Sequence, residues 1–172
     1  MAFDQEPVRD RWNMLQIRTY QPEDCDAVWE LHVIALQAVG AYLGDGPWNH
    51  DLSQIEAVYL QNGGEFFVGI DEGRLVAMGA LKRISDERAE IKRMRVHPSC
   101  QRRGFGQTVL TALEVRAREL GYRVLQLDTT TVQIAAQRLY EKNGYVEVRR
   151  SRVAQFECIY YEKTLSAPPP KT

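Results

Sequence analysis

The sequence lacks the features that direct a chain into or onto a membrane. No apolar run approaches the roughly 20 residues that a membrane-spanning helix needs, and residues 1–11 are charged where a signal peptide would be apolar. A basic excess is missing too, because 22 Lys and Arg are balanced by 23 Asp and Glu. We therefore expect a cytoplasmic protein that is dedicated to neither nucleic acid nor membranes.

Cysteine is scarce and widely spaced, since the chain contains only Cys25, Cys100 and Cys158. These residues form no CxxC pair, and no set of His, Cys and carboxylate residues has the spacing of a metal site. The sequence therefore predicts three reduced thiols, no disulfide framework and no metal.

The sequence does contain enough apolar material for one folded domain. Hydrophobic residues make up 44% of the 172 residues, and a chain of this length can bury roughly two-thirds of its unfolded surface. We expect a single domain over residues 13–165, a loose N-terminal tail at 1–12 and a proline-containing disordered tail at 166–172.

The spacing of apolar residues alternates between strand and helix patterns along the chain. Helices are predicted after Pro22, at 51–60, at 103–120 and, capped by Thr129–Thr131, up to Asn143. Three consecutive strands between 65 and 96 are predicted to form an antiparallel meander. The full set of predicted strands is 14–19, 65–70, 75–84, 89–96, 122–128, 145–148 and 156–164. This order predicts an α/β (α+β) domain with a mixed sheet.

The junction between the strand at 89–96 and the next helix carries the clearest chemical signal. The segment Gln101–Gly106 places two glycines at a helix start, where unpaired N–H groups and the helix dipole favour a phosphate. Residues 82–103 are also markedly basic. The alternative is a solvated basic strand before an ordinary helix. The glycine pattern fits neither a Walker A loop nor a dinucleotide fingerprint.

Two segments together resemble the GNAT superfamily of N-acetyltransferases over residues 15–165. One is Glu90–Pro98 followed by Gln101–Gly106, and the other is Ala135–Tyr145. The resemblance implies a mixed, mostly antiparallel sheet flanked by about four helices, with its fourth and fifth strands splayed around acetyl-CoA. It implies a cofactor site formed by Met94, Arg95, Val96, Arg102, Arg103, Gly104, Phe105, Gly106, Gln107 and Gln133. Gln133 stands where many members of the family carry Asn.

The same resemblance implies two catalytic residues. Tyr140 matches a tyrosine that faces the departing sulfur and can protonate it. Glu90 matches a position at which some members carry the base that deprotonates the amine. The alternatives are a tyrosine packed at the edge of the core and a surface carboxylate paired with Lys92.

The acceptor site is predicted less sharply. Its candidate residues are Tyr42, Trp48 and Arg83, although the two aromatics can equally anchor a glycine-rich loop. His32 is expected to be a satisfied helix residue.

We therefore expect transfer of an acetyl group from acetyl-CoA to a primary amine, on a small molecule or a peptide, by direct attack in a ternary complex. The resemblance also allows a homodimer. The alternatives are a non-catalytic acyl-CoA sensor and an interaction module of the same fold.

Overall fold

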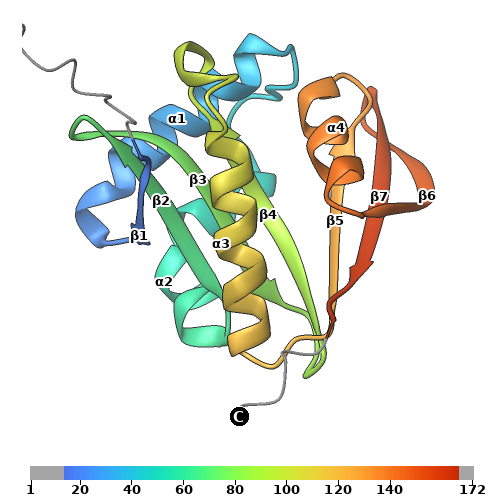
Figure 1. Cartoon of the computed structure of the whole chain (residues 1–172). Helices are drawn as coiled ribbons and strands as arrows, with labels where there is room; N and C mark the ends of the chain where they lie inside the picture. The colour runs from blue at the N-terminus through green and yellow to red at the C-terminus, as the bar shows by residue number, and fades with distance from the viewer. Residues whose placement is uncertain (1–13, 167–172) are drawn as a thin grey trace, which may run out of the picture.

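A computed structural model describes residues 14–166, so the predicted tail at 1–12 and residues 167–172 of the other tail lie outside the described residues. Seven strands form one sheet in the order β1-β2-β3-β4-β5-β7-β6 (Figure 1). The strands are β1 Gln16–Thr19, β2 Glu65–Asp71, β3 Arg74–Arg83, β4 Arg88–Val96, β5 Val124–Thr130, β6 Val146–Val153 and β7 Phe156–Thr164. The helices are α1 Cys25–Ala38, α2 Ile55–Val58, α3 Phe105–Glu119 and α4 Ile134–Lys142.

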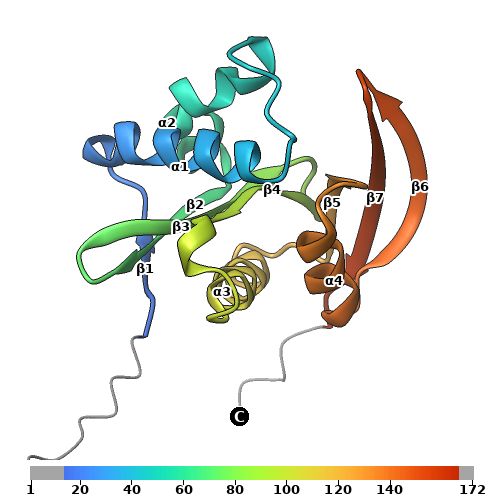
Figure 2. The same ribbon diagram turned by 90° about the horizontal axis from the view of Figure 1, so that it is seen from above.

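Helices cover both faces of the sheet. Figure 2 shows α1 and α2 on one face and α3 and α4 on the other. Two apolar clusters fill these layers: Val109, Leu110 and Leu113 of α3 belong to the first, and Val28 and Leu31 of α1 belong to the second. Burial on both faces explains why β3 is apolar or small at every position from Leu75 to Leu81. The predicted mixed, mostly antiparallel sheet is confirmed, and β4 with β5 is its parallel pair.

Two predicted element boundaries are wrong for identifiable reasons. The helix predicted at 51–60 is instead a 3-10 turn, η2 (Pro47–Ser53), followed by the single turn of α2 and a second 3-10 turn, η3 (Leu60–Asn62). Asp51 does not cap a helix, because its carboxylate bonds to Arg93 and to the Tyr59 hydroxyl. The threonines at 129–131 do not start α4 either, since β5 runs on to Thr130 and pairs with β7.

A bulge in β4 decides which side chains face which helices. Met78 pairs with Arg95 and Ala80 with Lys92, so two β4 residues stand opposite Gly79, and Arg93 has a positive φ of 57°. Cross-strand partners share a face of the sheet. Lys92 and Arg95 therefore lie on the α1 face with Ala80 and Met78.

β4 and β5 pair only at one end. Their parallel register joins Arg88, Ala89 and Glu90 to Val124, Leu125 and Gln126. Beyond Glu90 the two strands separate, and Figure 1 shows β5, β7, β6 and α4 turned away from the rest of the sheet. This is the splay implied by the family resemblance. It leaves the β5-facing edge of β4 after Glu90 without a neighbouring strand.

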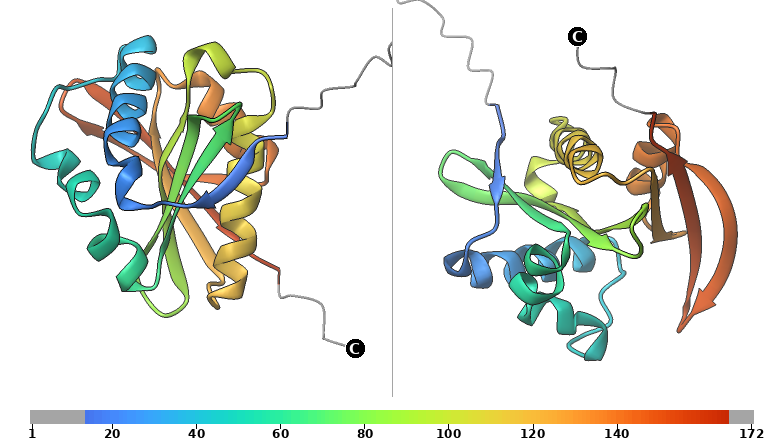
Figure 3. Two further views of the ribbon diagram at one scale, coloured as in Figure 1. Left: turned by 90° about the vertical axis from the view of Figure 1, so that its left-hand side faces the viewer. Right: turned by 90° about the horizontal axis from the view of Figure 1, so that it is seen from below.

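The two halves of the molecule are joined by the sheet and by α3. In the left panel of Figure 3, α1 and α3 lie on opposite sides of the central strands, and the right panel shows the β6–β7 hairpin standing apart from both. Helix α3 packs against β2, β3 and β4. The apolar cluster under α3 also contains Leu125, Leu127 and Tyr161, so both sides of the opening between β4 and β5 pack on one core.

Candidate active site

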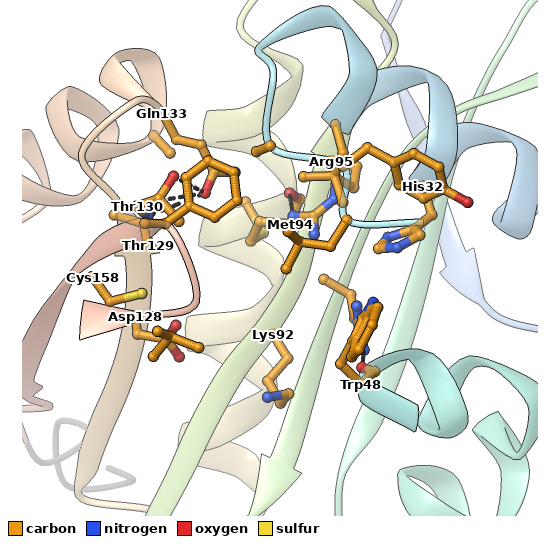
Figure 4. Close-up of a pocket in the computed structure, with 18 of the residues that line it drawn as sticks. His32, Trp48, Lys92, Met94, Arg95, Asp128, Thr129, Thr130, Gln133 and Cys158 are labelled. Atoms are coloured by element: carbon orange, nitrogen blue, oxygen red, sulfur yellow. Dashed lines mark hydrogen bonds between the residues drawn. The ribbon is translucent and has the colours of Figure 1, made fainter. Parts of the chain in front are cut away.

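A pocket of about 270 Å³ fills the opening between β4 and β5. Its walls come from α1, the segment at 41–49, β4, β5, the start of α4 and the β6–β7 hairpin (Figure 4). Segments that are far apart in the sequence thus meet at the point where the sheet divides. The polar or charged side chains that line it include Lys92, Arg93, Arg95, Asp128, Thr130 and Gln133.

Arg93 joins η2 to β4 through several hydrogen bonds. Its Nε donates to Asp51 Oδ2 at 2.8 Å, its Nη1 to Asn49 Oδ1 at 3.3 Å and its Nη2 to the carbonyl of Trp48 at 2.7 Å. Its Nη2 also pairs with Asp51 Oδ1. Because the bulge turns Arg93 toward η2, the charge of this arginine is neutralised inside the protein.

Arg95 lies two residues further along the same strand and has no such partner. Its Nη1 donates to the carbonyl of its neighbour Met94 at 2.7 Å. In residues 14–166, two buried side-chain nitrogens lack any hydrogen-bond partner, and they are Arg95 Nε and His32 Nδ1. Both residues line this pocket. Burial, followed by the nearby charge of Arg93, lowers the pKa of Arg95 to about 10.

His32 is buried and uncharged. Its Nε2 lies 3.1 Å from Asn49 Oδ1, an oxygen that also accepts from Arg93. Desolvation and the charges of Arg95 and Arg93 lower the pKa of His32 to about 3. The expectation of a satisfied helix histidine is therefore only half right, because Nδ1 has no hydrogen-bond partner within residues 14–166.

Tyr140 closes the pocket from α4. It is 4% exposed, stands edge-on to Tyr145 with ring centroids 5.8 Å apart, and lines the same pocket as Arg95. Burial raises the pKa of its hydroxyl, while the charge of Arg95 opposes that rise. The phenol is consequently protonated at neutral pH and able to donate a proton.

Glu90 lies at the base of the opening rather than in the pocket wall. Burial raises the pKa of its carboxyl, Lys92 opposes the rise, and Asp128 adds to it. Lys92 Nζ is 4.0 Å from Glu90 Oε2. Asp128 lines the pocket itself, on β5 and on the other side of the opening from Arg95 (Figure 4).

The start of α3 presents backbone donors beside this opening. The first helical bond runs from the N–H of Thr108 to the carbonyl of Gly104 at 3.0 Å. The N–H groups of Phe105, Gly106 and Gln107 therefore precede the bonded series. Arg102 and Gly104 take up positive φ values of 63° and 80°, which turns the chain tightly into the helix.

Several side chains predicted around that start are used elsewhere. Arg103 pairs with Asp71 at 2.7 Å and stacks on the ring of Phe105, which is itself buried in the core. Gln107 exchanges two 2.8 Å amide bonds with Asn143 and so ties α3 to the end of α4. These side chains thus have partners within the protein, while the backbone N–H groups of Phe105 and Gln107 precede the bonded series of the helix.

The remaining predicted site residues divide between the pocket and the surface. Gln133, Tyr42 and Trp48 line the pocket. The Gln133 Oε1 accepts three bonds from Thr129 and Thr130, which leaves its NH2 group to donate. Arg83 lies outside the pocket and pairs with the exposed Asp86.

Sequence reasoning did not predict that Asp128 lines the pocket. It considered Lys92 only as a partner of Glu90, although Lys92 lines the pocket too. A signal for Asp128 was present, because it alternates with the buried Leu125, Leu127 and Thr129 and so must face the other side of the strand. Over the described part of the chain no helix is long and apolar enough to cross a membrane. No cluster of three or more His, Cys, Asp or Glu side chains able to hold a metal occurs between residues 14 and 166.

Comparison with known proteins gives consistent results. The model of the Acetyltransferase (GNAT) family matches residues 25–145. Human N-acetyltransferase 8 is 28% identical over 133 residues, covering 69% of this chain and 57% of that protein. N-acetylaspartate synthetase of Xenopus tropicalis is 32% identical over 100 residues, covering 57% of this chain and 37% of that protein. The chain thus spans between about a third and somewhat over half of the length of these curated relatives.

Solved structures share the fold at low sequence identity. A GNAT-family acetyltransferase from Staphylococcus aureus Mu50 superposes with a TM-score of 0.81 at 22% identity, covering 89% of this chain and 100% of that one. A putative acetyltransferase from Salmonella typhimurium, solved with its cofactor acetyl-CoA, gives 0.71 at 21% identity, covering 92% and 100%. The ribosomal-protein-S18-alanine N-acetyltransferase of Escherichia coli gives 0.73 at 21% identity, covering 92% and 99%.

Proposed function

The chain belongs to the GNAT family of acetyltransferases, and from this premise we propose that it is an acetyl-CoA-dependent N-acetyltransferase that acts on a primary amine in a ternary complex. One observation carries the proposal. The unpaired edge of β4, the donors at the start of α3 and the phenol of Tyr140 all border a single pocket or its immediate surroundings.

The described residues include groups suited to the pyrophosphate and to the pantetheine arm of acetyl-CoA. The N–H groups of Phe105, Gly106 and Gln107 suit the pyrophosphate, because they stand at the positive end of a 15-residue helix. The open edge of β4 at Met94, Arg95 and Val96 suits the amides of the pantetheine arm, which would add to the sheet like a strand. Arg102 and Gly104 shape the turn, and the Gln133 amide adds a donor. Bound acetyl-CoA supplies the acetyl group as an activated thioester.

Tyr140 is the proposed general acid. Its hydroxyl is held protonated by burial, lines the pocket, and makes no hydrogen bond to another described residue that would occupy its proton. It is therefore free to protonate the leaving thiolate, which would otherwise depart as an anion in a poorly solvated site.

Glu90 is the proposed base, and the pocket-lining Asp128 is close enough to raise its pKa. An amine with a pKa near 10 is mostly protonated at neutral pH, so a proton must leave before the nitrogen can attack. The raised pKa of Glu90 makes its carboxylate a better proton acceptor than an exposed glutamate. Asp128, which lines the pocket, or an ordered water would carry the proton to it.

The relatives do not select an acceptor. One curated relative is named for the synthesis of N-acetylaspartate, whereas one structural neighbour is named for an alanine of a ribosomal protein. Both a small amine and a peptide amine are therefore compatible with the family.

The proposal is tested by measuring unfolding temperatures with acetyl-CoA, with ATP and NAD as phosphate-bearing controls. A ligand at about 100 times its Kd adds roughly 2.7 kcal/mol, which amounts to a rise of several degrees for a domain of this size. A selective rise should be followed by release of free thiol when amines are added. If acetyl-CoA stabilises the protein but no amine causes thiol release, the result would favour a non-catalytic acyl-CoA sensor. If acetyl-CoA does not stabilise the protein, the assignment of acetyl-CoA as its cofactor would be wrong.

A further inference from the structure

One of the cations that line the acceptor side of the pocket, Arg95, forms no ion pair within residues 14–166. Lys92, Arg93 and Arg95 line the pocket, against the single carboxylate of Asp128. Arg93 is neutralised by Asp51. Lys92 lies at 4.0 Å from Glu90, which leaves Arg95 as the cation without an acidic partner within residues 14–166.

Arg93 and Arg95 both line the pocket, but only Arg93 has an acidic partner in the protein. The two arginines are two residues apart on one strand, and both face the α1 side through the bulge. Arg93 donates to a carboxylate, an amide oxygen and a carbonyl. Arg95 donates to the neighbouring carbonyl alone, although burial makes its charge costly. A buried guanidinium in that state is costly, and its free donors suit an anion that enters the pocket.

We propose that the acceptor is a small amine that also carries a carboxylate, as a free amino acid does, and that the Arg95 guanidinium binds this carboxylate. The inference rests on the proposed function, since it names the substrate class of the same site. A simple alkylammonium would bring no anion to the unpaired Arg95. An amino acid brings its own negative charge to Arg95 and leaves its amine to the carboxylates of Asp128 and Glu90 across the opening.

The size and walls of the pocket agree with a small acceptor. Its volume of about 270 Å³ is below the range of about 300–1,000 Å³ that drug-sized ligands occupy, and the acetyl end of the donor takes part of it. Tyr42, Trp48 and Phe156 provide aromatic wall. We therefore expect amino acids with apolar side chains among the better acceptors.

The test compares acceptors that differ only in charge. L-phenylalanine and L-leucine are each paired with their amides, and acetyl transfer is followed at saturating acetyl-CoA in the wild type and in Arg95→Gln. We expect the wild type to prefer each acid over its amide by about 10- to 100-fold in kcat/KM, the usual effect of a hydrogen bond to a charged group. Arg95→Gln should lose this preference by weakening the acids alone.

Two further variants separate binding from folding. Arg95→Lys keeps the charge and should keep part of the preference. Arg123→Gln removes an exposed arginine just before β5, paired with Glu87 at 3.6 Å, and should change the kcat/KM of neither acids nor amides. Arg95→Gln should fold normally, because Arg95 bonds only to an adjacent carbonyl.

The proposal is overturned if the wild type acetylates acids and amides, or peptides, equally well. It is also overturned if Arg95→Gln lowers kcat/KM for the acids and the amides by the same factor. The same holds if the variant raises only the KM for acetyl-CoA, since Arg95 would then bind the donor. Should no amine be acetylated, the proposed function fails by itself. Calorimetry of N-acetyl-leucine with the protein–CoA complex then decides: binding lost in Arg95→Gln supports the carboxylate site, and no binding by the wild type refutes it.

Discussion

At the scale of single residues, the chemistry of this pocket depends on which groups are partnered and which are not. Sequence alone identified Tyr140 and Glu90 as candidates, because both stand in recognisable motifs. It named Arg95 as a site residue through its backbone and did not predict that the side chain of Arg93, two residues earlier in the same basic strand, is paired while that of Arg95 is not. The bulge places both arginines on one face of the sheet, and there Arg93 bonds to Asp51 while Arg95 does not. The partner of a side chain is a tertiary property that strand spacing does not encode.

Tyr140→Phe should lower kcat by about 100-fold, the lower end of the range for a general acid. The KM for acetyl-CoA should change little, because the aromatic ring stays in place. Stability should also be retained, since the ring packs on Tyr145 and Tyr161 without using its hydroxyl on either. Steady-state kinetics with the unfolding temperature measures all three, and a kcat equal to that of the wild type would end the acid assignment.

Glu90→Gln should remove an acidic limb of the pH–rate profile. A base works when deprotonated, so activity falls as the pH drops through the Glu90 pKa, which burial places above its ordinary value. The same shift makes the folded state favour the protonated form, so ionised Glu90 costs stability at neutral pH. The variant should thus be slower and more stable. Profiles that coincide with the wild type, together with a lost limb in Asp128→Asn, would transfer the role to Asp128.

At the scale of elements, the helix α3 and the bulged strand β4 build the site, and they were predicted unequally well. The amphipathic stripe and the glycines gave α3 to within two residues at each end. The turn η2 was misjudged because Asp51 looks like a helix cap in sequence. Its true partner, Arg93, lies 42 positions away in the chain. Long-range ion pairs of this kind override local capping preferences.

Gly106→Ala should separate folding from cofactor binding. An added Cβ would lie 3.4 Å from Leu139 Cδ2 and 3.8 Å from Val96 Cγ2, which is ordinary contact. Alanine in a helix gains about 0.5–1 kcal/mol over glycine, so the unfolding temperature should hold or rise. The methyl group stands where β4 and α4 border the opening, so the Kd for acetyl-CoA should rise by about tenfold. Calorimetric titration checks this, and unchanged affinity would move the phosphate site away from this turn.

Arg93→Gln should release η2 from β4. Arg93 and Asp51 are 11% and 15% exposed at their side chains, and breaking a buried pair of this kind costs about 3 kcal/mol. Chemical denaturation should register this loss. The double variant Arg93→Gln with Asp51→Asn should recover part of it, because no buried charge is then left unpaired. If the losses of unfolding free energy in the two single variants simply added up in the double variant, the ion pair between Arg93 and Asp51 would not hold η2 to β4.

At the scale of the whole molecule, the sheet has two parts that are joined by the short parallel pairing of β4 with β5. The element order and the mixed sheet were predictable from periodicity, since alternating apolar positions reflect local geometry. The splay came from the resemblance alone, because nothing in the composition of β4 or β5 states where their pairing stops. The register ends at Glu90 and Gln126, and the pocket begins directly beyond them.

The most direct test of the account is the initial rate of free-thiol release from acetyl-CoA as the concentration of amine is varied. The account predicts a saturable, amine-dependent rate in the wild type, a rate without amine near the spontaneous one, and an acetylated amine formed in equal amount to the thiol. Thiol release that is absent with every amine, in a protein that acetyl-CoA nevertheless stabilises, would contradict it and leave a binding protein of the same fold.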